Sequence, residues 1–119
     1  MKRYLNELQH RHYKRCQLSL DLVKISKNGI IWEDVTVKDI AADELRFYSP
    51  TRKYLVGESV QVRFVIQNII STHNFNLKGK ILLAKNTTYT LRFTDISKEE
   101  QINLDSAIMS SCSCCLIAE

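Results

Sequence analysis

The chain has 119 residues, a formal net charge of +4 and 45% hydrophobic residues. This length favours one domain with a buried core, and the ordinary composition excludes a disordered or low-complexity chain. No apolar run approaches the roughly 20 residues that a membrane-spanning helix needs, so we expect a cytoplasmic protein without membrane insertion. The positive excess is concentrated near the N-terminus, and charge alone admits phosphorylated small molecules, nucleic acid and acidic surfaces.

The first half of the chain predicts three antiparallel strands. Apolar and polar residues alternate over residues 16–26, as in a strand with one buried face. A second strand is expected over residues 30–40, where Trp32 should pack in the core. An acidic turn at residues 39–44 then leads into a short third strand over residues 45–48.

The second half of the chain predicts three further strands. The clearest covers residues 60–66, where every second residue is apolar, and it is followed by a polar stretch at residues 71–74 that we expect to be a loop. Alternating patterns over residues 77–84 and 89–93 predict the last two strands. The fold class is therefore mainly β, with six antiparallel strands that close into a small barrel, because closure removes exposed sheet edges.

A change of period after residue 95 predicts a C-terminal helix. Ser97 and Glu100 have the spacing of a capping box, which satisfies exposed N–H groups at a helix start. The helix should lie across one barrel opening with an apolar stripe formed by Ile102, Leu104, Ala107 and Ile108. The expected organisation is an N-terminal arm (residues 1–9), the barrel with its helix (residues 10–109) and a flexible Cys-containing tail (residues 110–119).

No residue pattern indicates catalysis or a metal site. Cys112, Cys114 and Cys115 in the tail have the wrong spacing for zinc and lack a nearby histidine. The three histidines lack the spacing of metal ligands, and no nucleophile with a base and no Gly-rich phosphate loop is evident. We therefore expect neither an enzyme nor a bound metal or cofactor.

Two arginines one helical turn apart, Arg11 and Arg15, precede the first predicted strand. Guanidinium groups bind phosphate bidentately and stack on purines, and the carboxylate of Asp39 is an acceptor for the N–H groups of guanine. The arginine segment and the acidic turn together predict a nucleotide-binding site. The same residues are also consistent with a solvated basic arm and with an aspartate that bonds its own turn backbone.

Four segments resemble the PilZ domain family, in its order and with its spacings. They are the Arg-x-x-x-Arg segment, the Asp-Ile-Ala-Ala turn, the entry into a strand at residues 57–60, and residues 91–97 before the final helix. The resemblance runs from about residue 10 to about residue 108. It implies a bacterial six-stranded β-barrel that binds the second messenger cyclic di-GMP and passes the signal to a partner protein or an attached domain.

Under this resemblance Arg11 and Arg15 close over cyclic di-GMP, and Asp39 reads a guanine. The family's second motif, Asp/Asn-x-Ser-x-x-Gly, falls on Asp39, Ala41 and Glu44, so only its first position is kept. Ala41 lacks the hydroxyl that serine presents to the ligand, a loss of about 0.5–1.5 kcal/mol. Glu44 brings a carboxylate toward an anionic ligand where the family has glycine. These five residues are the predicted ligand-binding set.

The leading hypothesis is a stand-alone PilZ-type receptor or adaptor for cyclic di-GMP that signals to a protein partner in motility or biofilm regulation. The alternative, motivated by Ala41 and Glu44, is a degenerate PilZ domain that does not bind the nucleotide and acts only as a protein-interaction module. A small barrel that binds nucleic acid through its basic N-terminus is a third hypothesis. It is disfavoured because no aromatic stacking platform is evident in the sequence.

Overall fold

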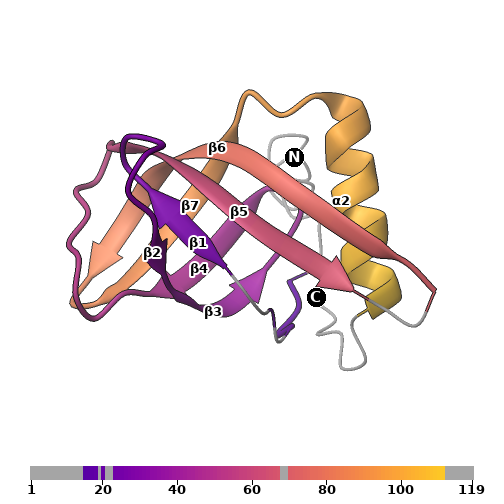
Figure 1. Cartoon of the computed structure of the whole chain (residues 1–119), viewed down its shortest axis with the longest axis horizontal. Helices are drawn as coiled ribbons and strands as arrows, with labels where there is room; N and C mark the ends of the chain where they lie inside the picture. Colours follow the sequence, from indigo (N-terminus) through magenta and orange to yellow (C-terminus); the bar gives the residue numbers. More distant parts are fainter. Residues whose placement is uncertain (1–14, 19, 21–22, 68–69, 112–119) are drawn as a thin grey trace, which may run out of the picture.

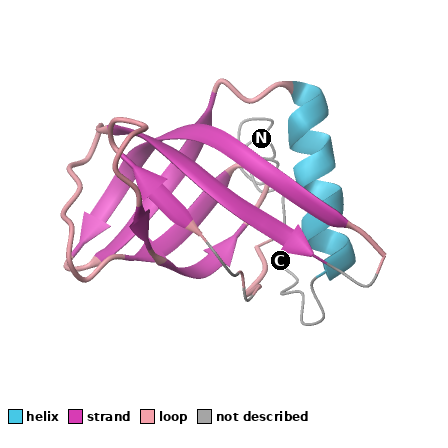
Figure 2. Cartoon of the chain, viewed as in Figure 1, coloured by secondary structure: helices cyan, strands magenta, loops and turns pink. Residues whose placement is uncertain are grey.

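The computed structural model describes residues 15–18, 20, 23–67 and 70–111. These residues form one curled antiparallel sheet and one helix, which lies beside the ends of strands β5 and β6 (Figure 1, Figure 2). Seven strands are hydrogen-bonded in the order β2-β1-β5-β6-β7-β4-β3. The elements are β1 (Lys24–Ser26), β2 (Glu33–Asp34), β3 (Thr36–Ile40), β4 (Glu44–Tyr48), β5 (Ser59–Gln67), β6 (Thr72–Lys85), β7 (Thr88–Thr94) and α2 (Lys98–Ser111).

One stretch of chain joins the two edges of the sheet. β2 pairs with β1 at one edge, β3 pairs with β4 at the other, and only Val35 separates β2 from β3. The sheet therefore curls until its edges meet, which confirms the predicted mainly β, barrel-like architecture. The described residues form seven strands instead of six because the stretch expected as one strand is divided at Val35, whose amide donates to the Val23 carbonyl at 3.1 Å.

The strand predicted over residues 16–26 is wrong for most of its described residues. Among these, Lys24–Ser26 form a strand, and Cys16 makes an isolated antiparallel bridge to Ile40 with N–O distances of 2.9 and 3.0 Å. Leu18 and Leu20 pack against the core without belonging to a strand. The alternation of leucines in this segment therefore reflects contact with the core and not a hydrogen-bonded ladder.

The strand predicted over residues 60–66 is confirmed as β5, which pairs with β6 along its whole length. β6 begins at Thr72, so the polar stretch expected to be a loop is the start of a strand. The alternation continues there because Phe75 is half-buried and stacks on Phe64, with ring centroids 5.2 Å apart, whereas Asn74 is exposed. The polar residues at this end of β6 were therefore wrongly predicted to form a loop.

The hydrophobic core lies between the inner face of the sheet and the helix. Phe47, Tyr54 and Tyr89 form an aromatic trio in the core, with ring centroids between 5.3 and 5.7 Å apart. Trp32, expected in the core, is instead half-buried beneath Arg63, whose guanidinium lies 4.1 Å from the ring centroid. The largest fully buried side chains are Phe47, Phe64, Ile25, Ile40, Leu45, Ile66, Ile81, Leu91, Leu104 and Ile108.

The predicted capping box of the helix is confirmed. The Ser97 hydroxyl accepts a hydrogen bond from the Glu100 amide at 3.0 Å, and the Glu100 carboxylate accepts one from the Ser97 amide at 3.4 Å. The helix buries Leu104, Ala107 and Ile108 as expected, but Ile102 is 57% exposed and lies outside the apolar stripe. In the described part of the chain, no helix is long and apolar enough to span a membrane.

Candidate functional site

The candidate site is built around the hairpin that joins β3 and β4. Asp39 lies near the end of β3, Glu44 is the first residue of β4, and Ala41 begins the turn between them. The turn is closed by a hydrogen bond from the Ala41 amide to the Glu44 carbonyl at 2.8 Å. The backbone bridge between Cys16 and Ile40 fixes the chain next to this hairpin and so places Arg15 over it.

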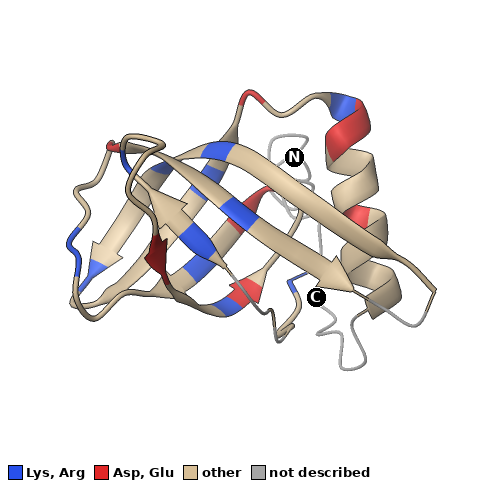
Figure 3. Ribbon diagram, in the orientation of Figure 1, with Lys and Arg blue, Asp and Glu red and all other residues tan. Residues whose placement is uncertain are grey.

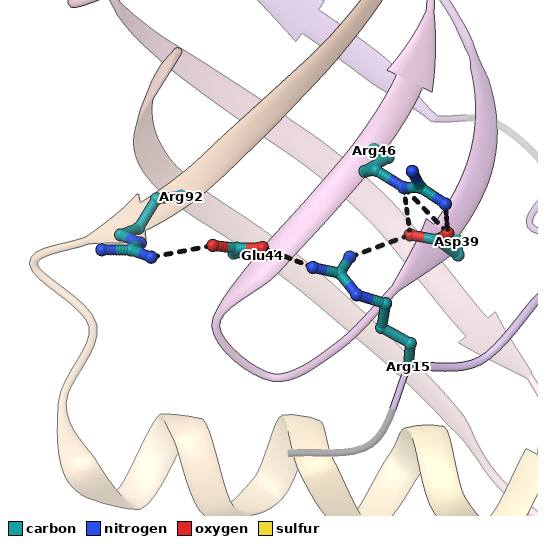
Figure 4. Close-up of polar contacts among 5 residues, drawn as sticks. All are labelled: Arg15, Asp39, Glu44, Arg46 and Arg92. Atoms are coloured by element: carbon teal, nitrogen blue, oxygen red, sulfur yellow. Dashed lines mark hydrogen bonds and ion pairs between the residues drawn. The ribbon is translucent and has the colours of Figure 1, made fainter. Parts of the chain in front are cut away.

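Arg15 contacts both carboxylates of the hairpin. Its Nη1 donates to Oδ1 of Asp39 at 3.2 Å, and its Nη2 donates to Oε1 of Glu44 at 2.7 Å (Figure 4). Three of the five predicted site residues, Arg15, Asp39 and Glu44, are thereby brought into one network. Ala41 is 2% exposed in the adjoining turn, and Arg11 lies outside the described residues. Arg15 thus lies at the predicted hairpin, where its partners are carboxylates of the protein, and the closing of the two arginines over a ligand stays a prediction.

Two further arginines, which were missed in the sequence, complete the network. Arg46 forms a bidentate pair with Asp39, with its Nε at 3.0 Å from Oδ1 and 2.9 Å from Oδ2 and its Nη2 also bonded to Oδ2. Nη2 of Arg92 donates to Oε2 of Glu44 at 2.9 Å. The result is a continuous row in the order Arg92, Glu44, Arg15, Asp39 and Arg46 (Figure 4).

Strand register explains why Arg46 and Arg92 belong to the site. Arg46 is the direct cross-strand partner of Asp39, and Arg92 is the direct cross-strand partner of Glu44. Side chains opposite each other in an antiparallel pair have Cβ atoms about 5 Å apart, which suits opposite charges. Arg46 was within reach of sequence reasoning, because alternation along β4 puts it on the same face as Glu44. Arg92 was not, because its pairing with β4 depends on a contact far away in the sequence.

The carboxylates are more buried than the arginines that surround them. The Asp39 and Glu44 side chains are 4% and 12% exposed, whereas those of Arg15, Arg46 and Arg92 are 27%, 46% and 56% exposed. Burial by itself would raise the pKa of Glu44, but hydrogen bonds and charge from Arg92 and Arg15 outweigh it, and the pKa lies below its ordinary value of 4.5. Glu44 is therefore ionised at neutral pH and held by two cations.

Asp43, in the turn, behaves in the opposite way. Its partial burial and the neighbouring charge of Glu44 raise its pKa above the ordinary value of 3.8. The pKa of Arg46 is raised by its hydrogen bonds to Asp39. The site therefore combines three guanidinium groups with two carboxylates that they neutralise, and a third carboxylate close by that is less well compensated.

The guanidinium donors of this row are largely occupied by the carboxylates of the chain. Arg15 already donates to two carboxylates, so a phosphate that approaches it has to compete with Glu44 for the same N–H groups. Among the described residues, no three His, Cys, Asp or Glu side chains are grouped so as to hold a metal ion. His73 lies away from this row, where it is hydrogen-bonded to Ser71 at 3.0 Å.

Glu44 does not occupy a backbone position that requires glycine. The positive-φ residues of the described chain are Gly29, Gly57, Asn86 and Asp95, so Glu44 has an ordinary conformation as the first residue of β4. The replacement of glycine at this motif position therefore has no cost in backbone strain. Its effect lies in the side chain, whose carboxylate bridges Arg15 and Arg92.

Comparisons with known proteins agree with this architecture. A family model described as PilZ domain matches residues 9–110. No match was found among curated proteins. Among solved structures, the chain is similar to the Bacillus subtilis inhibitor of motility (MotI/DgrA), with a TM-score of 0.70 and 18% identity over 84% of this chain and 50% of that one. This chain thus spans about half the length of that protein.

Two other structures share the fold. The PilZ domain of CeSA from a cellulose-synthesizing bacterium matches with a TM-score of 0.59 and 17% identity, over 82% of this chain and 93% of that one. The PilZ domain of YcgR from Escherichia coli, solved with c-di-GMP, matches with a TM-score of 0.56 and 14% identity, over 87% of this chain and 92% of that one. The chain therefore belongs to the PilZ domain family, a family of regulatory cyclic di-GMP-binding modules.

Proposed function

We propose that this PilZ domain is a non-catalytic bacterial signalling adaptor that acts on a partner protein in the cytoplasm, and that its own Glu44 closes the cyclic di-GMP position. The observation that carries the proposal is the Glu44 carboxylate, which bridges Arg15 at 2.7 Å and Arg92 at 2.9 Å. A carboxylate held between two guanidinium groups occupies the donors that a phosphate would otherwise use. The geometry thus supports best the second hypothesis of the sequence analysis, a PilZ domain that does not bind the nucleotide and acts as a protein-interaction module.

The energetic argument rests on what cyclic di-GMP would have to displace. A hydrogen bond to a charged group contributes about 1.5–3 kcal/mol, and the ligand would replace those of Glu44 with bonds of its own, for little net gain. The displaced carboxylate would then face the phosphate, and two like charges about 4 Å apart repel by roughly 4 kcal/mol near a protein surface. Even a shift of about 3 kcal/mol lowers affinity roughly a hundredfold.

The biological setting is proposed from the relatives. One structural neighbour is the inhibitor of motility MotI/DgrA, and another is a PilZ domain of CeSA from a cellulose-synthesizing bacterium. Motility control and surface attachment are therefore the processes in which we place this adaptor.

A second candidate function is a receptor in which the ligand phosphate displaces Glu44 from Arg15. It is favoured by the excess of cations in the row, because three arginines share two carboxylates and Arg46 and Arg92 are about half exposed. In that case binding would break the contact between Arg15 and Glu44 and free the Arg15 segment to close over the nucleotide.

Calorimetry with cyclic di-GMP separates the two functions. The adaptor proposal expects no heat from the wild-type protein at tens of micromolar ligand, but binding by the double variant Ala41→Ser/Glu44→Gly, which restores the family motif. Addition of Arg15→Ala to the double variant is the control and should abolish the restored binding.

Tight binding by the wild-type protein that is lost in Arg15→Ala would establish the receptor. A folded double variant that still does not bind would show that Glu44 is not what closes the site.

A further inference from the structure

A second cationic surface lies beside the candidate site, on the outward face of the sheet. This surface, here called the basic face, is formed by the exposed side chains of Arg63 on β5, Lys78 and Lys80 on β6, and Arg92 on β7. Figure 3 shows Lys and Arg on neighbouring strands across the sheet. Only Arg92 belongs to both the basic face and the row of arginines and carboxylates at the hairpin.

Arg92 is paired with Glu44, but the other three cations of this face have no carboxylate partner in the described chain. Lys78 and Lys80 form no ion pair with any described residue, and Arg63 contacts the ring of Trp32 instead of a carboxylate. Lys80 is the direct cross-strand partner of Arg92, an arrangement of like charges that destabilises a sheet. Glu44 compensates Arg92 from β4, so Lys78 and Lys80 are left as the cations of this face that an external anion would suit.

The acidic side chains near the basic face either form ion pairs with other residues or lie at the edge of the face. Asp34 pairs with Lys24 at 2.6 Å, and Glu58 pairs with Lys27 at 3.3 Å. Glu44 is held by Arg15 and Arg92, as described above. Asp95 is the acidic residue that lines the adjoining hollow, where it follows β7. The net charge of the face is therefore positive.

An open hollow of about 550 Å³ lies over β5, β6 and β7 on this side of the sheet. Lys78 and Lys80 provide its unpaired cations, Lys27 at its border is paired with Glu58, and neutral hydrogen-bonding groups come from Ser59, Gln61 and Thr94. Since the hollow is open and its cations are lysines on flexible stems, it suits carboxylates spread along a chain better than a single phosphate gripped by guanidinium forks.

We propose that the basic face binds an extended acidic segment of a partner protein; this inference rests on the proposed adaptor function and names its partner's chemistry. Lys78 and Lys80 are two residues apart on one strand, a separation of about 6.6–6.8 Å along the sheet. Alternate side chains of an extended peptide repeat at the same distance, so acidic residues at every second position match the two lysines. The gaps between the cations hold the hydroxyl and amide groups of Ser59, Gln61 and Thr94, which hydrogen-bond a peptide backbone.

A protein segment fits this face better than nucleic acid does. Single-stranded nucleic acid is bound by cationic grooves with aromatic rings on which bases stack. The residues that line the hollow include no aromatic side chain, and the nearby ring of Trp32 is already covered by Arg63 at 4.1 Å. A cationic surface without aromatic rings for stacking therefore favours the carboxylates of an acidic peptide over the bases of a nucleic acid.

Fluorescence anisotropy of a labelled peptide of alternating glutamate and serine tests the inference on the full chain at low salt. The wild-type protein should bind the peptide, and the variant Lys78→Glu/Lys80→Glu should bind about tenfold more weakly, since two attractions become repulsions. The matched control is Lys53→Glu/Lys85→Glu, which has the same net charge but changes exposed lysines of the β4–β5 loop and the end of β6. Its affinity should stay within about threefold of the wild type, because screening weakens distant charges.

Equal losses in the two double variants, or no binding by the wild-type protein at low salt, would overturn the inference. So would an oligothymidylate probe that binds more tightly than the acidic peptide and loses affinity in Lys78→Glu/Lys80→Glu, since that result assigns the face to nucleic acid. The cyclic di-GMP titration is read separately on the same proteins. If the wild-type protein binds both cyclic di-GMP and the peptide, only the proposal that Glu44 closes the nucleotide site is refuted. If it binds neither, only the proposal for the basic face is refuted.

Discussion

Asp39 should be the carboxylate on which the stability of the β3–β4 hairpin depends most. Its side chain is 4% exposed and accepts hydrogen bonds from Arg15 and from both Nε and Nη2 of Arg46. In Asp39→Asn, one acceptor oxygen becomes an NH₂ group that points at guanidinium donors, and the negative charge is lost. We therefore expect the variant to fold but to unfold more easily than the wild type.

The magnitude follows from the burial of the partners. Breaking a fully buried ion pair costs about 3–5 kcal/mol, but Arg15 and Arg46 are 27% and 46% exposed and regain hydration when Asp39 is neutralised. We expect a loss of about 2 kcal/mol in the free energy of unfolding. For a domain of this size that loss lowers the melting temperature by roughly 6–12 °C.

Urea denaturation at neutral pH measures the loss, and Asp34→Asn is its matched control. Asp34 pairs with Lys24 at 2.6 Å, but its side chain is 80% exposed. The same chemical change there should cost less than about 0.5 kcal/mol. Equal losses in the two variants, with unchanged denaturant slopes, would refute the reasoning, because burial would then not determine the contribution of the carboxylate.

Two further predictions concern acid stability and packing. The pKa of Glu44 in the folded protein lies below its ordinary value of 4.5, so its contribution to stability is present above pH 4.5 and is lost as the pH falls through the lower folded pKa. Glu44→Gln should therefore flatten the part of the melting-temperature profile that is measured below pH 4.5. A profile that is unchanged in this variant would contradict the assignment. Gly79→Ala should destabilise the protein by about 1–3 kcal/mol, because a Cβ there would lie 2.7 Å from the Leu91 side chain and 2.8 Å from the Arg92 carbonyl. Urea denaturation measures that loss, and a variant as stable as the wild type would show that the β6–β7 pair accommodates the methyl group.

The features that could be predicted from the sequence are those set by local pattern. The alternation along β5 and the capping box of Ser97 and Glu100 both depend on residues a few positions apart, and both are confirmed. The prediction of a strand over residues 16–26 failed because Leu18 and Leu20 contact the core without belonging to a strand. Burial imposes the same alternation on such a segment as on a strand.

The candidate site shows the same division between local and distant information. The approach of Arg15 to Asp39 was foreseen from the paired motifs, and the role of the Glu44 charge was foreseen as repulsion of a ligand. That Glu44 would be neutralised by Arg92 could not be foreseen, because the pairing of β4 with β7 joins residues 48 positions apart. The role of Arg11 in binding the ligand stays a prediction, as do the arm and tail boundaries.

The stretch of chain shared by both edges of the sheet carries two carboxylates that fasten different parts of the fold. Glu33, at one end of this stretch, accepts hydrogen bonds from Ser49, Thr51 and Tyr54 and so anchors the loop between β4 and β5. Asp39, at the other end, is anchored by Arg15 and Arg46. The register shift between Val37 and Asp39 lies between the two anchors. The β3–β4 hairpin and the loop between β4 and β5 are therefore fastened to the same short stretch of chain, each by its own buried or half-buried carboxylate.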